Sequence, residues 1–169
     1  MDKAKEQEKE FLSFLENYKR LITKVSGIYC HDREERKDLI QEIIIQLWKS
    51  FPRYDNKYPI STWTYRIAIN VSISFIRKNS SQKKARERYR SEIQWMEFNP
   101  PPRDERLDML YQVIDMLKPL DKAIIMLYLE EHSNKEIAEI MGLSITNVST
   151  RKLRIKETLR HHFEITKNE

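Results

Sequence analysis

One of the two glycines in this 169-residue chain, Gly142, separates two segments with helical periodicity near the carboxyl end. A residue that tolerates positive φ is needed where one helix ends and the chain turns sharply into the next. Ser133 and Glu136 have the spacing of a capping box for the first helix, and Ser144 can cap the second. The small and apolar residues expected to pack the two segments together are Ile137, Ala138, Met141, Leu143 and Val148. Together these features predict a helix-turn-helix.

The second helix of this motif is rich in hydroxyl, amide and basic side chains. Such groups read base edges and bind phosphates in the major groove of DNA. The candidate DNA-binding residues are Thr146, Asn147, Ser149, Thr150, Arg151, Arg154 and Lys156. Two interpretations of Arg154 remain open, a bidentate contact with a base or a contact with phosphate alone. For the motif as a whole, the alternative is a helical hairpin that only completes a core, which leaves the polar and basic residues unexplained.

Composition favours a polyanionic partner and a reducing compartment. Lys and Arg total 31 against 26 Asp and Glu, which gives a formal net charge of +5. Cys30 is the single cysteine, so neither an intrachain disulfide nor a thiolate zinc cluster is expected. The sequence has no apolar run of about 18 residues and no signal-peptide pattern at its start. We therefore expect a cytoplasmic protein without membrane insertion.

Basic residues are also concentrated in mid-chain. Between Arg77 and Arg90, seven basic residues accompany the single acid Glu87. A run of this kind can follow a nucleic-acid backbone, and the alternative is a solvated helix face.

Apolar periodicity predicts a helical scaffold around these features. We expect one helix to end near Gly27, a second to run from a cap at Asp32 to Pro52, and a third to span about 61–77. Three prolines at 100–102 predict a linker over 91–106. Beyond it we expect a helix stopped by Pro119, another over about 120–130, and the helix-turn-helix. The predicted fold is all-α, with two small helical domains at 1–90 and 107–169 joined by the Pro-rich linker.

Two segments of the first domain carry a family resemblance. The segment Ser61-Thr-Trp-Thr-Tyr-Arg-Ile-Ala-Ile-Asn70 resembles conserved region 2 of bacterial sigma factors of the extracytoplasmic-function type. It follows Asp38-Leu-Ile-Gln41-Glu42, which is similar to the Asp-x-x-Gln-Glu segment of that family. The order of the segments and the terminal helix-turn-helix extend the resemblance over nearly the whole chain. It implies a sigma factor that binds core RNA polymerase and directs promoter-specific transcription initiation.

The resemblance also implies roles for particular residues and partners. Contact with the clamp helices of the polymerase large subunit falls on Asp38, Leu39, Gln41, Glu42 and Trp48. Melting and binding of the minus-10 element fall on Tyr54, Trp63, Arg66, Asn70, Arg77, Lys78, Lys83 and Lys84. Among these, Tyr54 and Asn70 would form a pocket for a flipped base. The helix-turn-helix would bind the minus-35 element, the polymerase flap would be a second contact, and an anti-sigma factor is the implied inhibitor.

Several positions depart from the family pattern or stay open. Ser74 stands where many members have Asp, Thr64 replaces a common apolar residue, and Lys152 interrupts the apolar seam of the last helix. Packing into the core is the favoured interpretation of Trp63. No enzyme, cofactor or metal is expected, because Cys30-His31 and His161-His162 lack ligand or triad partners. Two rival functions are a dimeric operator-binding regulator and a helical protein-interaction adaptor.

Overall fold

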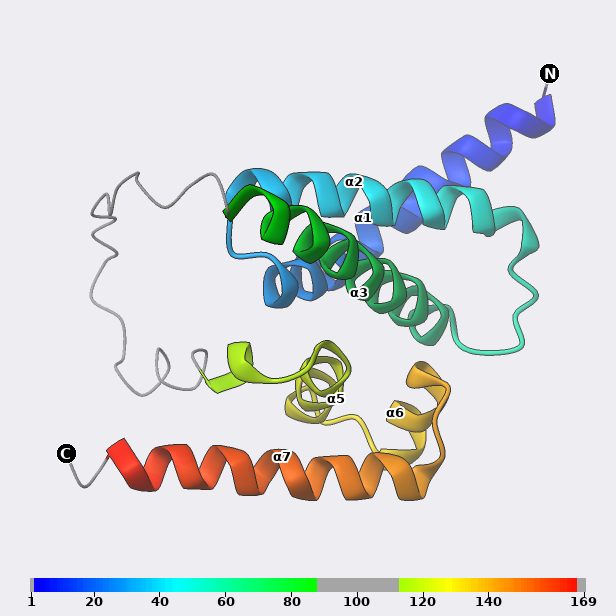
Figure 1. The fold of residues 1–169 in the computed structure, drawn as a ribbon. Coiled ribbons are helices and arrows are strands. Elements are labelled where there is room, and N and C mark those ends of the chain that lie inside the picture. Colours follow the sequence, from blue (N-terminus) through cyan, green and yellow to red (C-terminus); the bar gives the residue numbers. More distant parts are fainter. Residues whose placement is uncertain (1, 88–112, 167–169) are drawn as a thin grey trace.

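The computed structural model describes residues 2–87 and 113–166 of the chain, with side chains for 5–79 and 113–161. An amino-terminal unit contains α1 (Asp2–Tyr29), α2 (Arg33–Ser50), the short 3-10 helix η1 (Phe51–Arg53) and α3 (Ile60–Glu87). A carboxy-terminal unit contains α5 (Pro119–Leu129), α6 (Asn134–Met141) and α7 (Ile145–Thr166), and it packs below the first in Figure 1. Since these residues contain helices and no strand, the predicted all-α class is confirmed. The predicted linker at 91–106 lies outside the described residues.

A capping residue sets where α2 begins, and the absence of a stop signal lets α3 continue past its expected end. The Asp32 carboxylate caps α2 by accepting hydrogen bonds from the main-chain N–H groups of Glu34 (3.0 Å) and Glu35 (2.9 Å). Helix α3 continues to Glu87 instead of ending at the expected Arg77. The added residues 78–87 include three Lys and contain neither Gly nor Pro, so nothing in them stops a helix.

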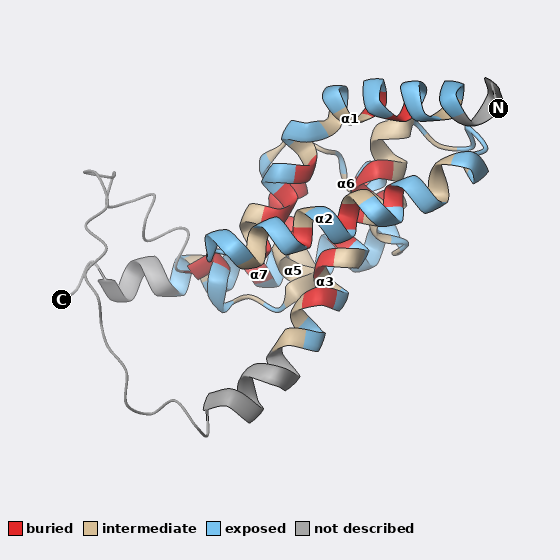
Figure 2. Cartoon of the chain, turned by 90° about the horizontal axis from the view of Figure 1, so that it is seen from above, coloured by how far each residue is buried: buried red, intermediate tan, exposed pale blue. Residues whose placement is uncertain are grey.

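An apolar core holds the amino-terminal unit together. Val25, Leu39, Ile43 and Leu47 are fully buried between the helices, and Figure 2 shows buried residues on their facing sides. An aromatic cluster extends this core. Its members are Phe11, Phe14, Trp48, Phe51, Tyr54 and Trp63. Trp63 is half-buried in this cluster, which supports the core-packing interpretation.

The buried face of α3 contains hydroxyl groups beside a small residue. Thr64 donates to the carbonyl of Ile60 and Ser72 to the carbonyl of Ala68, both at 2.7 Å. Each hydroxyl is therefore satisfied within its own helix. Ala68 has no exposed surface, so small side chains let α3 pack closely against its neighbours. The two buried hydroxyls leave no hydrogen bond unmade at this contact. This explains why Thr64 can replace an apolar residue.

The helix-turn-helix forms as predicted. Ser133 and Glu136 make both hydrogen bonds of the capping box at the start of α6. Gly142 follows α6 in the left-handed region, with φ 66° and ψ 34°. Ser144 then accepts from the Asn147 N–H at 3.1 Å, so it caps α7. Val148 and Ile155 are buried from α7 into the core of the carboxy-terminal unit.

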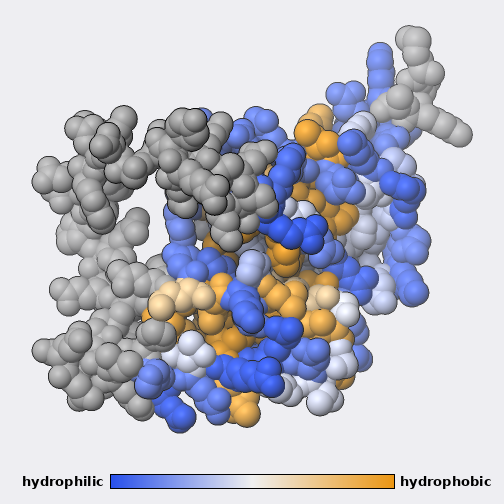
Figure 3. Space-filling model, in the orientation of Figure 1, coloured by the Kyte–Doolittle hydropathy of each residue, from blue (hydrophilic) through white to orange (hydrophobic). Residues whose placement is uncertain are grey.

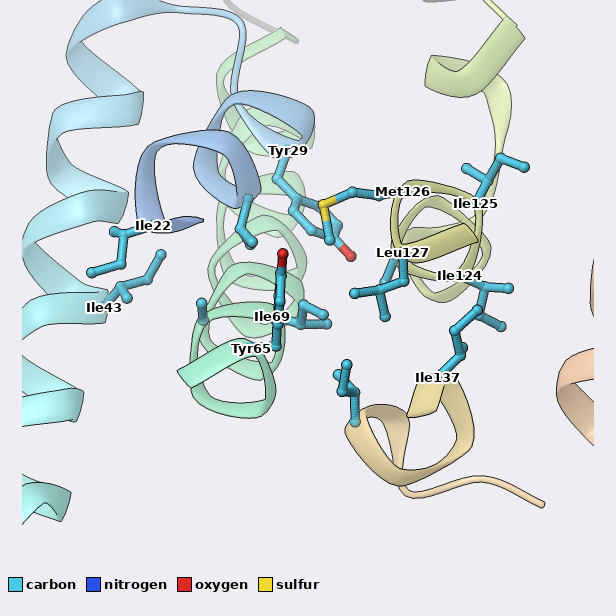
Figure 4. Packing of buried hydrophobic residues seen from close by; sticks show 14 of the residues in the cluster. Ile22, Tyr29, Ile43, Tyr65, Ile69, Ile124, Ile125, Met126, Leu127 and Ile137 are labelled. Atoms are coloured by element: carbon cyan, nitrogen blue, oxygen red, sulfur yellow. The ribbon is translucent and has the colours of Figure 1, made fainter. Parts of the chain in front are cut away.

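The two units are in direct contact. Helices α5 and α6 lie against α3. Figure 4 shows Tyr29, Tyr65 and Ile69 of the first unit facing Met126 and Leu127 of the second, and all five are buried. On the face seen in Figure 3, hydrophobic side chains gather between the two units while hydrophilic ones follow the outer edges.

Candidate nucleic-acid and polymerase interface

Helix α7 separates its buried residues from its candidate DNA-binding residues. Val148 is fully buried, and Ile155 is 3% exposed. The exposed candidates are Thr146, Asn147, Ser149, Thr150, Arg154 and Lys156. Thr150 and Arg154 are four residues apart, so their side chains share one helix face. This arrangement provides a row of hydroxyl, amide and guanidinium groups along one helix, and the major groove of DNA is wide enough to admit a helix.

Two basic candidates on α7 are held by neighbouring residues. Arg151 is half-buried, and its guanidinium donates to Asp121 at 2.8 Å and to Asn147 at 2.9 Å. Lys156 lies with its ammonium 4.6 Å from the ring centre of Tyr128 on α5. The hydrogen bond and charge of Lys156 lower the pKa of the Tyr128 hydroxyl. Both cations therefore already contact neighbouring side chains in the free protein. A side chain that only contacts DNA would project into solvent instead.

Sequence reasoning missed Asn134 as a member of this surface. Its amide donates to the Ser149 hydroxyl at 2.9 Å, which links the first turn of α6 to α7. Asn134 directly follows the capping Ser133, where its side chain is free of any capping role. Its position directly after the expected capping residue was the sequence signal that could have identified Asn134.

Helix α3 places the candidates for single-stranded DNA on one side. Asn70, Arg77 and Lys78 are exposed. Arg66 is half-buried, stacks over the Tyr58 ring at 4.0 Å, and donates from Nε to the Glu139 carbonyl at 2.8 Å. The side chains of Lys83 and Lys84 lie outside the described residues. Of the basic minus-10 candidates, the structure thus describes the side chains of Arg66, Arg77 and Lys78, and Arg66 is bonded to the other unit.

Tyr54 and Asn70, the two residues expected to form a base pocket, lie in different surroundings. Tyr54 packs its ring 5.2 Å from that of Trp63 and donates to the Tyr58 carbonyl at 2.7 Å. Asn70 lines a groove of about 580 Å³ between α2 and α3, and Tyr54 is absent from its lining. Asn70 lies seven residues beyond Trp63, about two helical turns along α3. Tyr54 and Asn70 thus have different neighbours in the structure, and a shared pocket for a flipped base stays a prediction.

The groove beside Asn70 contains residues that the sequence analysis did not select. Its lining consists of Glu42, Ile45, Gln46, Lys49, Ile67, Asn70, Val71 and Ser74. The α2 members recur at three- and four-residue steps and flank the buried Leu39, Ile43 and Leu47 stripe. This spacing was visible in the sequence, but only packing against α3 turns it into a groove.

The outer face of α2 presents the polymerase candidates. Asp38, Gln41 and Glu42 are exposed, and Trp48 is 39% exposed with one edge on Phe11. Leu39 is fully buried in the core. The expectation that Leu39 contacts a partner is therefore wrong, because its side chain faces α1 and α3 instead of solvent. Its contribution is to hold α2 in position.

Charge effects are strongest where the units and helices meet. Burial raises the pKa of the Tyr65 hydroxyl, and the adjacent Glu130 carboxylate raises it further. Burial also opposes ionisation of Asp115, but hydrogen bonds from His31 and Lys122 hold its pKa below the ordinary value. Hydrogen bonds from Ser133 lower the pKa of Glu136 in the capping box. Ionised acids thus stabilise both the motif and the contact between the units.

An all-helical protein whose helix-turn-helix exposes such a polar face belongs to the class of DNA-binding transcription proteins. Comparison with known families agrees and is more specific. Residues 14–82 match the model of sigma-70 region 2, and residues 107–159 match that of sigma-70 region 4. The chain belongs to the sigma-70 family of RNA polymerase sigma factors, and within it to the extracytoplasmic-function type. It is a sigma factor that directs promoter-specific transcription initiation.

Relatives and solved structures cover most of the chain. It is 28% identical over 154 residues to the RNA polymerase sigma factor SigV of Bacillus subtilis, covering 90% of this chain and 89% of SigV. It is 29% identical over 162 residues to SigW of the same organism, covering 89% and 87%. The fold resembles that of the sigma factor RpoE from Bartonella quintana, solved with the anti-sigma factor NepR. That match has a TM-score of 0.72, 18% identity, and coverage of 93% of this chain and 98% of RpoE.

Among the helices described in the structure, none is both long and apolar enough to cross a membrane.

Proposed function

We propose that this sigma factor divides promoter recognition between its units, with α7 binding the minus-35 element and α3 the minus-10 element. The observation that carries the proposal is the separation on α7 between buried Val148 and Ile155 and exposed Ser149, Thr150 and Arg154. The buried residues fix the helix on its own unit. The exposed residues then meet duplex DNA in a defined orientation, as direct base readout requires.

The minus-10 role rests on exposed groups suited to single-stranded DNA. Asn70 offers an amide to a base edge, while Arg77 and Lys78 supply positive charge for the backbone. Tyr54 presents an aromatic ring beside Trp63 at the start of α3. Tyr54 and Asn70 are both proposed to contact unpaired bases of the melted strand. Lys83 and Lys84 follow in the sequence and would add positive charge for the backbone.

The outer face of α2 is the proposed polymerase contact. Exposed Asp38, Gln41 and Glu42 form an acidic and amide surface, with Trp48 as an apolar neighbour. Such a surface fits the clamp helices of the polymerase large subunit if they carry basic groups, and the charge pairing favours specific encounter. The flap is the corresponding contact for the carboxy-terminal unit. This activity belongs in the cytoplasm and needs no catalytic group, cofactor or metal.

An inhibitory partner is part of the proposal. In one similar structure the sigma factor RpoE is bound to the anti-sigma factor NepR, and in another CnrH is bound to the cytosolic domain of CnrY. CnrH matches this chain with a TM-score of 0.65 and 16% identity. We expect an anti-sigma factor for this chain as well.

In vitro transcription with core RNA polymerase on genomic fragments tests the proposal. Initiation at discrete sites should require both core polymerase and this protein. The same fragments should show no tight binding by the protein alone, which separates a sigma factor from a dimeric operator-binding regulator. Initiation that is equal with and without the protein would refute the proposed division of promoter recognition.

A further inference from the structure

We propose that Tyr128, Lys152 and Lys156 form a binding site for one backbone phosphate of duplex DNA. The site lies between α5 and α7, beside the face of α7 that exposes Thr150 and Arg154. It rests on the proposed binding of α7 to the minus-35 element. Tyr128 and Lys152 are absent from the DNA-binding candidates selected from the sequence, so they are new members of this surface.

The three side chains meet where α5 and α7 pack together. The Lys152 ammonium lies 3.9 Å from the centre of the Tyr128 ring, and the Lys156 ammonium lies 4.6 Å from it. Lys152 and Lys156 are four residues apart on α7, so they share one side of that helix. Lys156 is exposed, while Tyr128 and Lys152 are half-buried. One aromatic ring therefore holds two cations together at the surface.

The two cations lack a counter-charge. Lys152 donates to the Asn134 amide oxygen at 2.8 Å, and Lys156 donates to the Tyr128 hydroxyl. Within the described ranges, neither ammonium forms an ion pair with a carboxylate. Like charges four residues apart on a helix destabilise each other. Because an ammonium has three donors, each lysine keeps donors for a further acceptor. An anion bound between them would use these donors and offset the repulsion.

The other side of α7 has a different charge balance. Arg151 also borders the buried residues of α7, and its guanidinium pairs with the Asp121 carboxylate at 2.8 Å. The charge of Arg151 is therefore balanced within the carboxy-terminal unit, as expected for a cation that stabilises the packing of α5 on α7. By contrast, the charges of Lys152 and Lys156 remain available to an anionic partner.

The location of the site on α7 favours a DNA phosphate as its ligand. Ser149, Lys152 and Lys156 follow one another at three- and four-residue steps, on a stripe beside Thr150 and Arg154. A helix with its side chains is about 10–12 Å across, and the major groove is about 12 Å wide. When Thr150 and Arg154 face the base edges, the neighbouring stripe therefore faces the phosphates that border the groove. Lysine ammonium and tyrosine hydroxyl groups both bind such phosphates.

Lys152→Met tests the site, because its unbranched apolar side chain can still cover the Tyr128 ring while the charge is lost. Holoenzyme assembled with this variant should bind duplex promoters roughly 3- to 10-fold more weakly, as for a lost hydrogen bond to a charged group. The decrease should be the same for every promoter sequence, since phosphate contacts carry no base preference. The slope of log affinity against log salt concentration should become shallower by about one. The melting temperature of the free variant shows that it is folded.

Two further variants separate the hydroxyl from the charge. Tyr128→Phe keeps the ring and both cations, so it should weaken promoter binding by roughly 2- to 5-fold through the lost hydroxyl, with the salt dependence unchanged. The matched control is Lys19→Met, which removes one positive charge from an exposed ion pair with Glu16 on α1. It should equal the wild type in affinity and in salt dependence.

The outcomes distinguish the phosphate site from the proposed role of α7. Wild-type promoter affinity and salt dependence in folded Lys152→Met would overturn the site and leave Lys152 as a packing residue. Weaker binding of the variant to core polymerase, with promoter affinity of the assembled holoenzyme unchanged, would also overturn it and indicate an acidic protein segment as the ligand. If Arg154→Ala impairs promoter binding but Lys152→Met and Tyr128→Phe do not, only the phosphate site fails. If Arg154→Ala has no effect either, the minus-35 role of α7 fails as well. Should Lys152→Met unfold, Tyr128→Phe decides.

Discussion

The ammonium group of Lys152 lies 3.9 Å from the ring centre of Tyr128. It also donates to the Asn134 side chain at 2.8 Å. In the sequence, Lys152 interrupts an apolar seam of the last helix. In the structure, its aliphatic stem and charge cover an aromatic ring, so the seam continues by a cation–π contact.

Lys152→Ala should therefore destabilise the carboxy-terminal unit. We expect a decrease of roughly 2 to 4 °C in melting temperature, because both the cation–π contact and the bond to Asn134 are lost. Lys135→Ala, which removes an exposed lysine of α6, is the control and should leave the melting temperature unchanged. Circular dichroism at 222 nm follows both proteins, and equal melting temperatures would show that Lys152 is only a surface charge.

The two glycines should respond to alanine with opposite signs. Gly142 has φ 66°, and an added Cβ would meet no atom within 4 Å, so Gly142→Ala costs only backbone strain of about 1 to 2 kcal/mol. Gly27 lies inside α1, where a Cβ would meet Arg36 at an ordinary 3.9 Å. Gly27→Ala should stabilise the fold by about 0.5 to 1 kcal/mol. Urea denaturation measures both, and a stabilising Gly142→Ala would contradict the strained turn.

Polymerase binding should depend on the exposed acids and amide of α2. The triple variant Asp38→Ala/Gln41→Ala/Glu42→Ala should weaken binding to core RNA polymerase by roughly tenfold or more, with helicity intact. Its control is Glu34→Ala/Lys37→Ala, which removes an exposed ion pair of the same helix. Fluorescence titration with core polymerase compares them. Equal affinities of the triple variant and wild type would remove this face from the polymerase contact.

Melting of the promoter should depend on both Asn70 and Tyr54. Asn70→Ala and Tyr54→Ala should each lower permanganate reactivity of promoter thymines more than they lower closed-complex binding. Tyr54→Phe keeps the ring and loses the 2.7 Å bond to Tyr58, so it separates stacking from loop order. Tyr54 and Asn70 have different neighbours in the free protein, so the effects of Asn70→Ala and Tyr54→Ala should add as free energies unless both side chains hold the same base. If a premelted promoter rescues neither variant, the melting role is wrong.

Base readout and phosphate contact should separate along α7. Arg154→Ala should cost about 1 to 3 kcal/mol and relax preference at one minus-35 position if Arg154 makes a bidentate base contact. Arg160→Ala should weaken binding across all sequences and reduce its salt dependence. Selection from randomised minus-35 sequences distinguishes these effects. An unchanged preference for Arg154→Ala would leave phosphate contact as its role.

Features set by neighbouring residues in the chain could be predicted from the sequence. The capping box of Ser133 and Glu136, the turn at Gly142 and the cap at Asp32 each depend on spacings of two to four residues. The helices follow from apolar periodicity for the same reason. Leu39 shows what a sequence motif leaves open, because adjacent residues of a helix face different directions. Asp38 is exposed, whereas Leu39 is buried.

Contacts between distant segments could not be predicted in this way. Arg66 and Glu139 are 73 positions apart, and Tyr65 and Glu130 are 65 apart. Their pairing depends on how two packed units meet, which periodicity does not specify. The groove beside Asn70 has the same origin, because α2 and α3 each supply half of its lining.

The self-contained hydrogen bonds of Thr64 and Ser72 have a consequence for the evolution of promoter preference. Because these hydroxyls bond within α3, the packing of α3 against the other helices does not depend on the residues on its exposed side. If α3 binds the minus-10 element as proposed, substitutions at the exposed Asn70 or Ser74 can therefore change which sequences it prefers while the buried side of the helix keeps its packing. Promoter preference could then diverge without a cost in stability.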